Sequence, residues 1–228
     1  MNIQGYQKLT LLDFPGKTAC TVFTGGCNLR CPFCHNAGLV RTPLAEQNAT
    51  QEVLQYLAQR RGILDGVCVT GGEPLLQPDL ADFLRDVRDL GYAVKLDTNG
   101  TLPDRLAALL AEGLVDYVAM DVKSSPQGYG LATGADMDVA VYDRSIQILR
   151  DSGLPHEFRT TAVGGIHTPA DFAAIGQWLA GADAYYIQRF VDSGQLLGEG
   201  FHPFSIEEME HLLTTVREYI PSAQLRGC

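Results

Sequence analysis

The chain has 228 residues, 46% of them hydrophobic and 19% charged, which predicts one large folded domain or two small ones and excludes a disordered chain. Its 17 basic and 27 acidic residues give a formal net charge of −10. This charge argues against nucleic acid and anionic membranes as partners, because both bind through Lys and Arg. No apolar run reaches the roughly 18 residues of a membrane span, and the N-terminus lacks a signal pattern, so we expect a cytoplasmic protein.

Short apolar runs alternate with longer amphipathic stretches along the chain. The apolar runs predict strands buried on both faces over residues 19–23, 67–70, 93–96, 117–120, 158–163 and 184–187. The amphipathic stretches predict helices over residues 51–61, 78–90, 103–113, 138–153, 169–181 and 205–220. Proline near the start and glycine just past the end mark several of these helices.

This alternation predicts an α/β fold with six β/α units, a parallel sheet and right-handed crossovers. Six such units could close partly into a barrel or lie open as a doubly wound sheet, and periodicity alone does not decide between them. Residues 18–228 are expected to form the core domain, with residues 1–17 packing on it as an N-terminal extension. In either architecture a ligand should bind at the carboxyl ends of the strands.

Three cysteines follow the first predicted strand within eight residues. Cys27, Cys31 and Cys34 have the spacing C-x3-C-x2-C, which lets three thiolates on one loop hold an inorganic centre. A closed zinc site would normally need a fourth ligand, and His35 is awkwardly placed to supply it. Three cysteines on a 4Fe–4S cluster would instead leave one iron open for a substrate or cofactor. A zinc site or incidental core cysteines remain alternatives.

Polar residues stand at the ends of the next predicted strands. Gly71 and Gly72 allow close approach of a ligand to the backbone, and Pro74 stiffens the turn. The later strands end in further polar groups, which should converge on one mouth if the sheet is parallel. They are Asp97, Asn99, Asp121, Lys123, Arg159, Thr161, Gln188 and Arg189.

The cysteine triplet, with Phe33 before its last cysteine, and the TGGEP motif at residues 70–74 together resemble the radical S-adenosylmethionine (SAM) superfamily. The resemblance covers essentially the whole chain. It implies a single-domain partial TIM-like barrel of six β/α units. It also implies a 4Fe–4S cluster on Cys27, Cys31 and Cys34, whose open iron binds the amino and carboxylate groups of SAM.

Within that superfamily, DTNG at residues 97–100 and DVK at residues 121–123 are similar to segments of the glycyl radical enzyme activases. Residues 5–40 look most like activating proteins of anaerobic ribonucleoside-triphosphate reductase. The resemblance implies reductive cleavage of SAM to methionine and a 5′-deoxyadenosyl radical, which takes a hydrogen atom from a glycine Cα of a partner enzyme. It implies a low-potential electron donor such as flavodoxin or ferredoxin. Pyruvate formate-lyase activating enzymes often carry a histidine near the sixth strand end, where this chain has Gln188 and Arg189.

The resemblance also implies roles for single residues. Phe33, Cys34 and His35 would contact the adenine. The motif formed by Gly71, Gly72, Glu73 and Pro74 would hold the methionine ammonium. Asp97 and Lys123 are the expected catalytic residues, which bind SAM and position the target. The other expected cofactor contacts are Asn99, Asp121, Arg159 and Gln188.

The remaining cysteines and histidines carry weaker expectations. Cys20 and Cys68 lie in predicted strands and should be buried, whereas Cys228 should be a solvated thiol. His156, His167 and His211 are expected in loops or at the surface. His202 receives no role.

Three functions therefore compete. The first is an activase of a glycyl radical enzyme, most simply anaerobic ribonucleotide reductase or otherwise pyruvate formate-lyase. The second is a radical SAM enzyme that modifies a peptide or a small molecule. The third is a zinc- or cluster-binding module without chemistry. The activase is favoured because the motifs agree in type, order and strand-end position.

Overall fold

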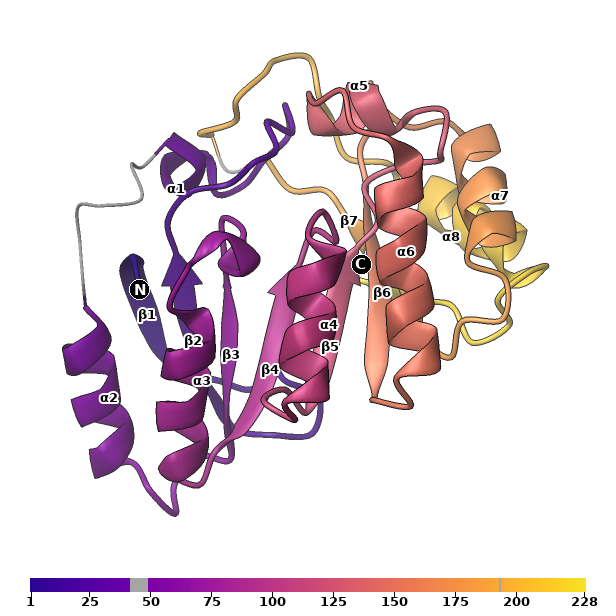
Figure 1. Cartoon of the computed structure of the whole chain (residues 1–228). Helices are drawn as coiled ribbons and strands as arrows, with labels where there is room; N and C mark the ends of the chain where they lie inside the picture. The colour runs from indigo at the N-terminus through magenta and orange to yellow at the C-terminus, as the bar shows by residue number, and fades with distance from the viewer. Residues whose placement is uncertain (42–48, 193) are drawn as a thin grey trace.

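The computed structural model describes residues 1–41, 49–192 and 194–228. In these residues a single eight-stranded sheet runs through the molecule (Figure 1). Its strands are β1 (Ile3–Thr10), β2 (Ala19–Thr24), β3 (Gly66–Gly71), β4 (Ala93–Thr98), β5 (Tyr117–Asp121), β6 (His156–Ala162), β7 (Tyr185–Arg189) and β8 (Gln224–Arg226).

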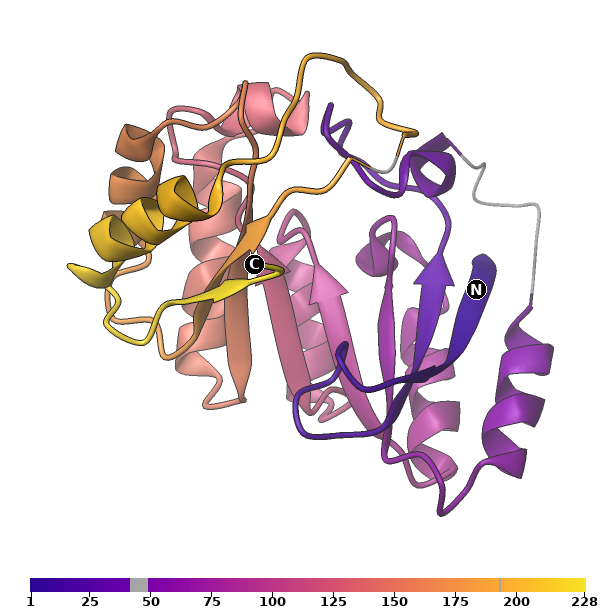
Figure 2. The same cartoon turned by 180° about the vertical axis from the view of Figure 1, so that it is seen from behind.

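The strand order decides between the two architectures that the sequence left open. The strands lie in the order β1 to β8, and every neighbouring pair from β2 to β8 is parallel. A doubly wound sheet would reverse its order at a switch point, and this sheet has none. Right-handed crossovers in one direction place the helices on one face, as in a barrel wall. Figure 2 shows the opposite face, where the central strands β3, β4 and β5 stand in front of α3 and α4. The predicted single-domain α/β fold of the partial-barrel type is confirmed.

The six predicted strands correspond to β2–β7, and the sequence missed the two edge strands. β1 pairs antiparallel with β2, and most of its residues are half-buried or exposed. An edge strand with one solvated face has no continuous apolar run, so the search for buried strands missed it. β8 is too short to give a pattern. The division of the chain into residues 1–17 and 18–228 stays a prediction.

The helices follow the predicted stretches, with clear local signals at their starts. Pro103 and Pro169 each stand in the first turn of a helix, and Thr168 and Ser205 each form a capping box. Pro78 lies two residues before its helix and does not open it. The helices are α1 (Ala37–Arg41), α2 (Thr50–Gln59), α3 (Leu80–Asp89), α4 (Pro103–Ala111), α5 (Tyr129–Thr133), α6 (Val139–Asp151), α7 (Pro169–Trp178) and α8 (Ile206–Arg217), with a 3₁₀ turn, η1 (Pro74–Leu76).

Two apolar clusters stabilise this arrangement. The larger one fills the space between the sheet and the helices. A smaller one lies above the strand ends and contains Leu29, Cys31, Phe33, Val163 and Phe190. The smaller cluster fixes the cysteine loop to the ends of β6 and β7.

No helix in the described residues combines the length and the apolar character that crossing a membrane requires.

Candidate functional site

A cavity of about 330 Å³ opens at the carboxyl ends of the parallel strands. It is bounded by the loop after β2, the turn after β3 and the last residues of β4 to β7, where parallel sheets bind ligands. Most of the predicted site residues line it. They are Cys27, Cys31, Phe33, Cys34, His35, Gly71, Gly72, Asp97, Asn99, Asp121, Lys123, Arg159 and Gln188.

The loop between β2 and α1 carries the cysteines and is tied to other segments through its backbone. The N–H of Gly26 donates to the Leu39 carbonyl at 2.8 Å, and the N–H of Arg30 donates to the Thr133 carbonyl at 2.8 Å. Phe33 is buried in the small apolar cluster. The path of the loop is therefore fixed by α1, α5 and the strand ends.

The three thiols of this loop are free. Cys31 is buried, whereas Cys27 and Cys34 are half-buried. Burial raises the pKa of the Cys27 thiol and raises the pKa of Cys31 to about 11. Such thiols are protonated at neutral pH, so a metal that binds them must displace their protons.

The thiol set fits an iron–sulfur cluster better than a single ion. Within the described residues, no three His, Cys, Asp or Glu side chains are placed to bind one metal ion. A 4Fe–4S cluster has a different requirement, because each thiolate binds a different iron of a larger body. The described lining contains these three cysteines and no other. On a cubane, this donor set would leave one iron without a cysteine.

The turn after β3 lies directly against the cysteine loop. The N–H of Glu73 donates to the Gly26 carbonyl at 2.8 Å, and the N–H of Gly72 donates to the Thr24 carbonyl at 2.9 Å. Gly71 has φ +121°, and a Cβ there would lie 2.3 Å from the Thr24 nitrogen. The two glycines therefore allow backbone-to-backbone contact between the two loops.

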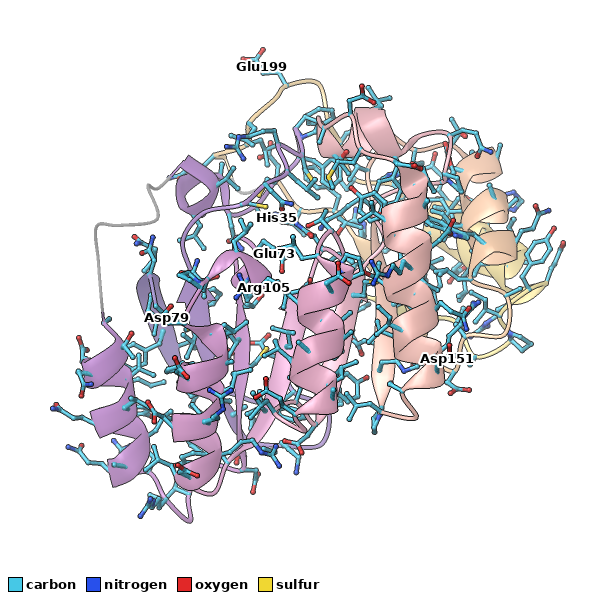
Figure 3. All side chains as sticks on the ribbon, viewed as in Figure 1. His35, Glu73, Asp79, Arg105, Asp151 and Glu199 are labelled. Carbon is cyan, nitrogen blue, oxygen red and sulfur yellow. The ribbon has the colours of Figure 1, made fainter. Side chains whose placement is uncertain are left out.

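Glu73 and Pro74 do not line the cavity. Glu73 is fully buried behind the wall and accepts hydrogen bonds from the N–H of Leu75 at 3.0 Å, the hydroxyl of Thr98 at 2.9 Å and the N–H of Asn99 at 2.7 Å. Burial raises the pKa of Glu73 to about 7, although these hydrogen bonds oppose the shift. Figure 3 shows Glu73 and His35 at the same end of the strands. The Glu73 side chain connects the β3 turn to the end of β4.

An ion-pair network crosses the floor of the cavity. Arg159 on β6 donates from Nε to Asp121 at 2.9 Å and from a terminal nitrogen to Asp97 at 3.3 Å. Lys123 donates to the other oxygen of Asp121 at 2.9 Å, and Lys95 pairs with Asp97. Arg159 therefore bridges two carboxylates from neighbouring strands.

This network fixes the charge of its members. Burial raises the pKa of Asp97, but Arg159 and Lys95 outweigh it and hold that pKa below its usual value. Burial also raises the pKa of Asp121, but Arg159 and Lys123 outweigh this effect and hold that pKa well below its usual range. Burial lowers the pKa of Lys123, but Asp121 outweighs this and raises it. Asp97, Asp121 and Lys123 are therefore ionised at neutral pH.

Asn99 links the network region to the cysteines. Its side-chain nitrogen lies 3.8 Å from the Cys27 sulfur and donates to Asn28 at 3.0 Å. Its side-chain oxygen accepts hydrogen bonds from Thr101. The amide is therefore oriented with its donor toward Cys27.

His167 lies in the loop between β6 and α7, as the sequence allowed, but it is buried and not at the surface. Its Nδ1 accepts the N–H of Val163 at 3.1 Å, so Nε2 carries the proton that bonds to the Lys123 carbonyl at 2.8 Å. Burial lowers the pKa of His167, which favours this neutral form. His167 thus joins the segments that follow β5 and β6.

Apart from the three loop cysteines and His35, the cysteines and histidines of the described residues lie outside the cavity lining. Cys20 and Cys68 are buried and Cys228 is exposed, as predicted. His156 is the first residue of β6 and not a loop residue, whereas His211 is exposed. The exposed His202 pairs with Gly164 through its backbone.

Several lining residues received no prediction. Thr70 and Thr98 stand at strand ends, where alternation with buried neighbours could have indicated them. The others belong to the cysteine loop or α1. Leu29 and Val40 are apolar, and Asn36 is polar but does not stand at a strand end, where the search for site residues looked.

Comparison with known proteins gives three findings. A sequence model described as the radical SAM superfamily matches residues 21–179. A candidate glycyl-radical enzyme activating enzyme of Methanocaldococcus jannaschii is 27% identical over 236 residues, which cover 98% of this chain and 95% of that protein. The pyruvate formate-lyase-activating enzyme of Clostridium pasteurianum is 32% identical over 138 residues, 58% of this chain and 57% of that protein.

Other relatives and structures are similar over part of their length. Relatives that match shorter stretches carry other names, including 7-carboxy-7-deazaguanine synthase and GTP 3′,8-cyclase. The crystal structure of SuiB from Streptococcus suis, bound to its precursor peptide SuiA, superposes with a TM-score of 0.70 at 14% identity. That match covers 91% of this chain and 48% of SuiB, so the chain spans about half the length of SuiB. At this identity the similarity shows the fold alone.

Proposed function

The chain belongs to the radical SAM superfamily, and from this membership we propose that Cys27, Cys31 and Cys34 bind a 4Fe–4S cluster and that SAM binds beside it. The observation that carries the proposal is that three free thiols line the same cavity as the Gly71–Gly72 turn and the ion-pair network. When bound, the cluster supplies the electron for cleavage of SAM into methionine and a 5′-deoxyadenosyl radical.

The chain's own residues would orient SAM in this cavity. SAM carries a carboxylate and two positive centres, the ammonium and the sulfonium. The backbone at Gly71 and Gly72 would accept the ammonium. Phe33, Cys34 and His35 would enclose the adenine. The His35 ring already packs against the Phe190 ring in a tilted arrangement, with 5.6 Å between the ring centroids.

The strand-end network would hold the rest of SAM and the target. Asp121 and Lys123 are the most exposed members of the network, with 29% and 21% of their side chains accessible, so they can form new contacts. Asp97 has both oxygens engaged by Lys95 and Arg159 and would act through its fixed charge. Asn99 and Gln188 would complete the polar lining.

The target in this proposal is a glycine of a partner glycyl radical enzyme, most simply an anaerobic ribonucleotide reductase. A hydrogen atom would pass from the glycine Cα to C5′ of the nucleoside, leaving a radical on the glycine. One electron per turnover would come from a low-potential donor such as flavodoxin or ferredoxin. The match over nearly the full length of both chains to a candidate glycyl-radical enzyme activating enzyme supports a partner of the glycyl radical class. A cytoplasmic location belongs to the same proposal.

The experiment combines anaerobic cluster-loaded protein, dithionite, SAM and the anaerobic reductase of the same organism, followed by electron paramagnetic resonance. An activase should give a doublet from the remaining Cα hydrogen of the glycyl radical. The doublet should collapse to a singlet when the reductase contains deuterated glycine. Cys34→Ser protein is the matched control and should give no signal.

Cleavage of SAM with no glycyl signal on the reductase would contradict the choice of partner. A doublet on pyruvate formate-lyase instead would favour that alternative. If neither enzyme gives a signal but a peptide or small molecule is turned over, the chain modifies that substrate. One zinc and no iron in anaerobically purified protein would contradict the whole proposal.

A further inference from the structure

Glu157 on β6 is a buried carboxylate with three hydrogen-bond donors. Its side chain is 1% exposed. It accepts from the hydroxyl of Tyr117 at 3.0 Å and from two nitrogens of Arg226 at 3.0 and 3.2 Å. The Arg226 guanidinium also stacks on the Tyr186 ring, with its Cζ 3.7 Å from the ring centroid. This two-bond geometry fixes the Arg226 guanidinium firmly.

Arg159 lies two residues along β6 on the same face. One of its terminal nitrogens lies 3.3 Å from Asp97 and 4.0 Å from Glu157. That nitrogen therefore stands between two carboxylates, and Glu157 competes with Asp97 for it. Arg226 removes the competition, because it satisfies both oxygens of Glu157.

We propose that Arg226, on the last strand of the chain, is a positioning residue that holds Arg159 on Asp97 and Asp121 by neutralising Glu157. The role rests on the proposed function, in which those carboxylates belong to the SAM site. Among the strands of the described residues, β8 pairs with β7 alone, at the edge of the sheet (Figure 2). The C-terminal strand would thus set the charge pattern of a cavity that it does not line.

The physical reason is the cost of an unpaired buried charge. Without Arg226, the charged side chain nearest to Glu157 among the described ion pairs is Arg159. A shift of Arg159 toward Glu157 would weaken its bonds to Asp97 and Asp121. The two carboxylates would then lose the cation between them and repel each other.

The alternative is that Arg226 merely attaches β8 to the sheet, and a set of variants separates the two roles. Arg226→Gln removes the charge from Glu157, Glu157→Gln removes the competing carboxylate, and the double variant removes both. Arg217→Gln is the matched control, because Arg217 also holds the C-terminal segment, by a 3.0 Å bond to the Ala223 carbonyl, but does not touch Glu157. Arg226→Lys keeps the charge if Arg226→Gln folds poorly.

The measurements are the Kd of SAM for the anaerobic cluster-loaded protein and the NMR signal of the Arg159 Nε–H in the protein without SAM. R226Q should raise the Kd of SAM about tenfold, because residues of one ion-pair network are energetically coupled. It should also shift the Nε–H signal of Arg159. The double variant should restore the wild-type Kd and the wild-type Nε–H signal. R217Q and E157Q should leave the Kd and the signal near their wild-type values.

An R226Q variant with the wild-type Kd and an unshifted Nε–H signal would overturn the proposal. A double variant as impaired as R226Q would also overturn it and show a purely structural role. If the wild-type protein binds no SAM, the proposed function fails, and the Nε–H signal still decides whether Arg226 positions Arg159.

Discussion

Gly72 and Gly26 lie backbone against backbone, so that a Cβ on Gly72 would stand 2.0 Å from the Gly26 carbonyl oxygen. This contact joins the turn after β3 to the first residues of the cysteine loop. The position of the thiols relative to the strand ends therefore depends on the absence of a side chain at residue 72.

We expect Gly72→Ala to displace the cysteine loop. The added methyl group should lower the free energy of unfolding by about 2 kcal/mol or more, because the backbone on both sides must move. Urea unfolding measures the loss, and iron analysis after anaerobic reconstitution measures the effect on the site. Gly5→Ala is the control, since a Cβ on Gly5 meets nothing within 4 Å. An unchanged iron content in G72A would contradict the proposed importance of this contact.

The cysteine assignment predicts different effects for different thiols. Cys27→Ser, Cys31→Ser and Cys34→Ser should each reduce reconstituted iron from about four atoms per chain to less than one. Cys228→Ser should keep the wild-type iron content, because Cys228 is exposed and does not line the cavity. Iron and sulfide analysis with the visible absorption spectrum provides the measurement. Full iron in any of the three loop variants would remove that cysteine from the ligand set.

The bridge formed by Arg159 should contribute to stability before any ligand binds. The Arg159 side chain is 12% exposed and pairs with two carboxylates, so Arg159→Gln leaves both without their shared cation. We expect a loss of about 3 kcal/mol in unfolding free energy. Arg144→Gln, which breaks an exposed pair with Asp104, should cost less than about 1 kcal/mol. Equal losses in urea unfolding would show that the bridge is no stronger than a surface pair.

Glu73 should make stability depend on pH. Its pKa of about 7 in the folded protein lies above the usual value near 4.3, so between these pH values the folded state binds the proton more tightly. The contribution of Glu73 is complete below about pH 4.3 and disappears as the pH rises through about 7. Relative to wild type, Glu73→Gln should therefore gain stability as the pH rises from 5 to 7, by at most about 1.4 kcal/mol per pH unit.

Urea unfolding of both proteins across this pH range checks the prediction. Glu112→Gln controls for the loss of an acidic residue at the surface, since the Glu112 side chain is 46% exposed. A constant difference between E73Q and wild type over this range would mean that Glu73 titrates normally.

The sequence predicted the parallel strands because strands buried on both faces appear as apolar runs, and β2 to β7 all do so. It also predicted that Asp97, Asp121 and Arg159 would converge, because the carboxyl ends of neighbouring parallel strands share one edge. It missed β1, because its solvated face breaks up the apolar run.

Contacts between distant residues were not predictable in the same way. The direction of Glu73 depends on donors from the end of β4, and the pairing of Glu157 with Arg226 joins residues 69 positions apart. Lys95 lies in a strand that the sequence predicted to be buried on both faces, but its ion pair with Asp97 was not predicted. The burial of His167 likewise depends on the Val163 and Lys123 backbone groups that it joins.

The most direct test of the central claim is the fate of SAM on the isolated protein. Anaerobic cluster-loaded protein is reduced with dithionite in the presence of SAM, and the products are quantified by liquid chromatography and mass spectrometry. We predict methionine and 5′-deoxyadenosine in equal amounts from the wild-type protein and neither product from Cys31→Ser. Intact SAM after incubation with reduced, fully loaded wild-type protein would contradict the account.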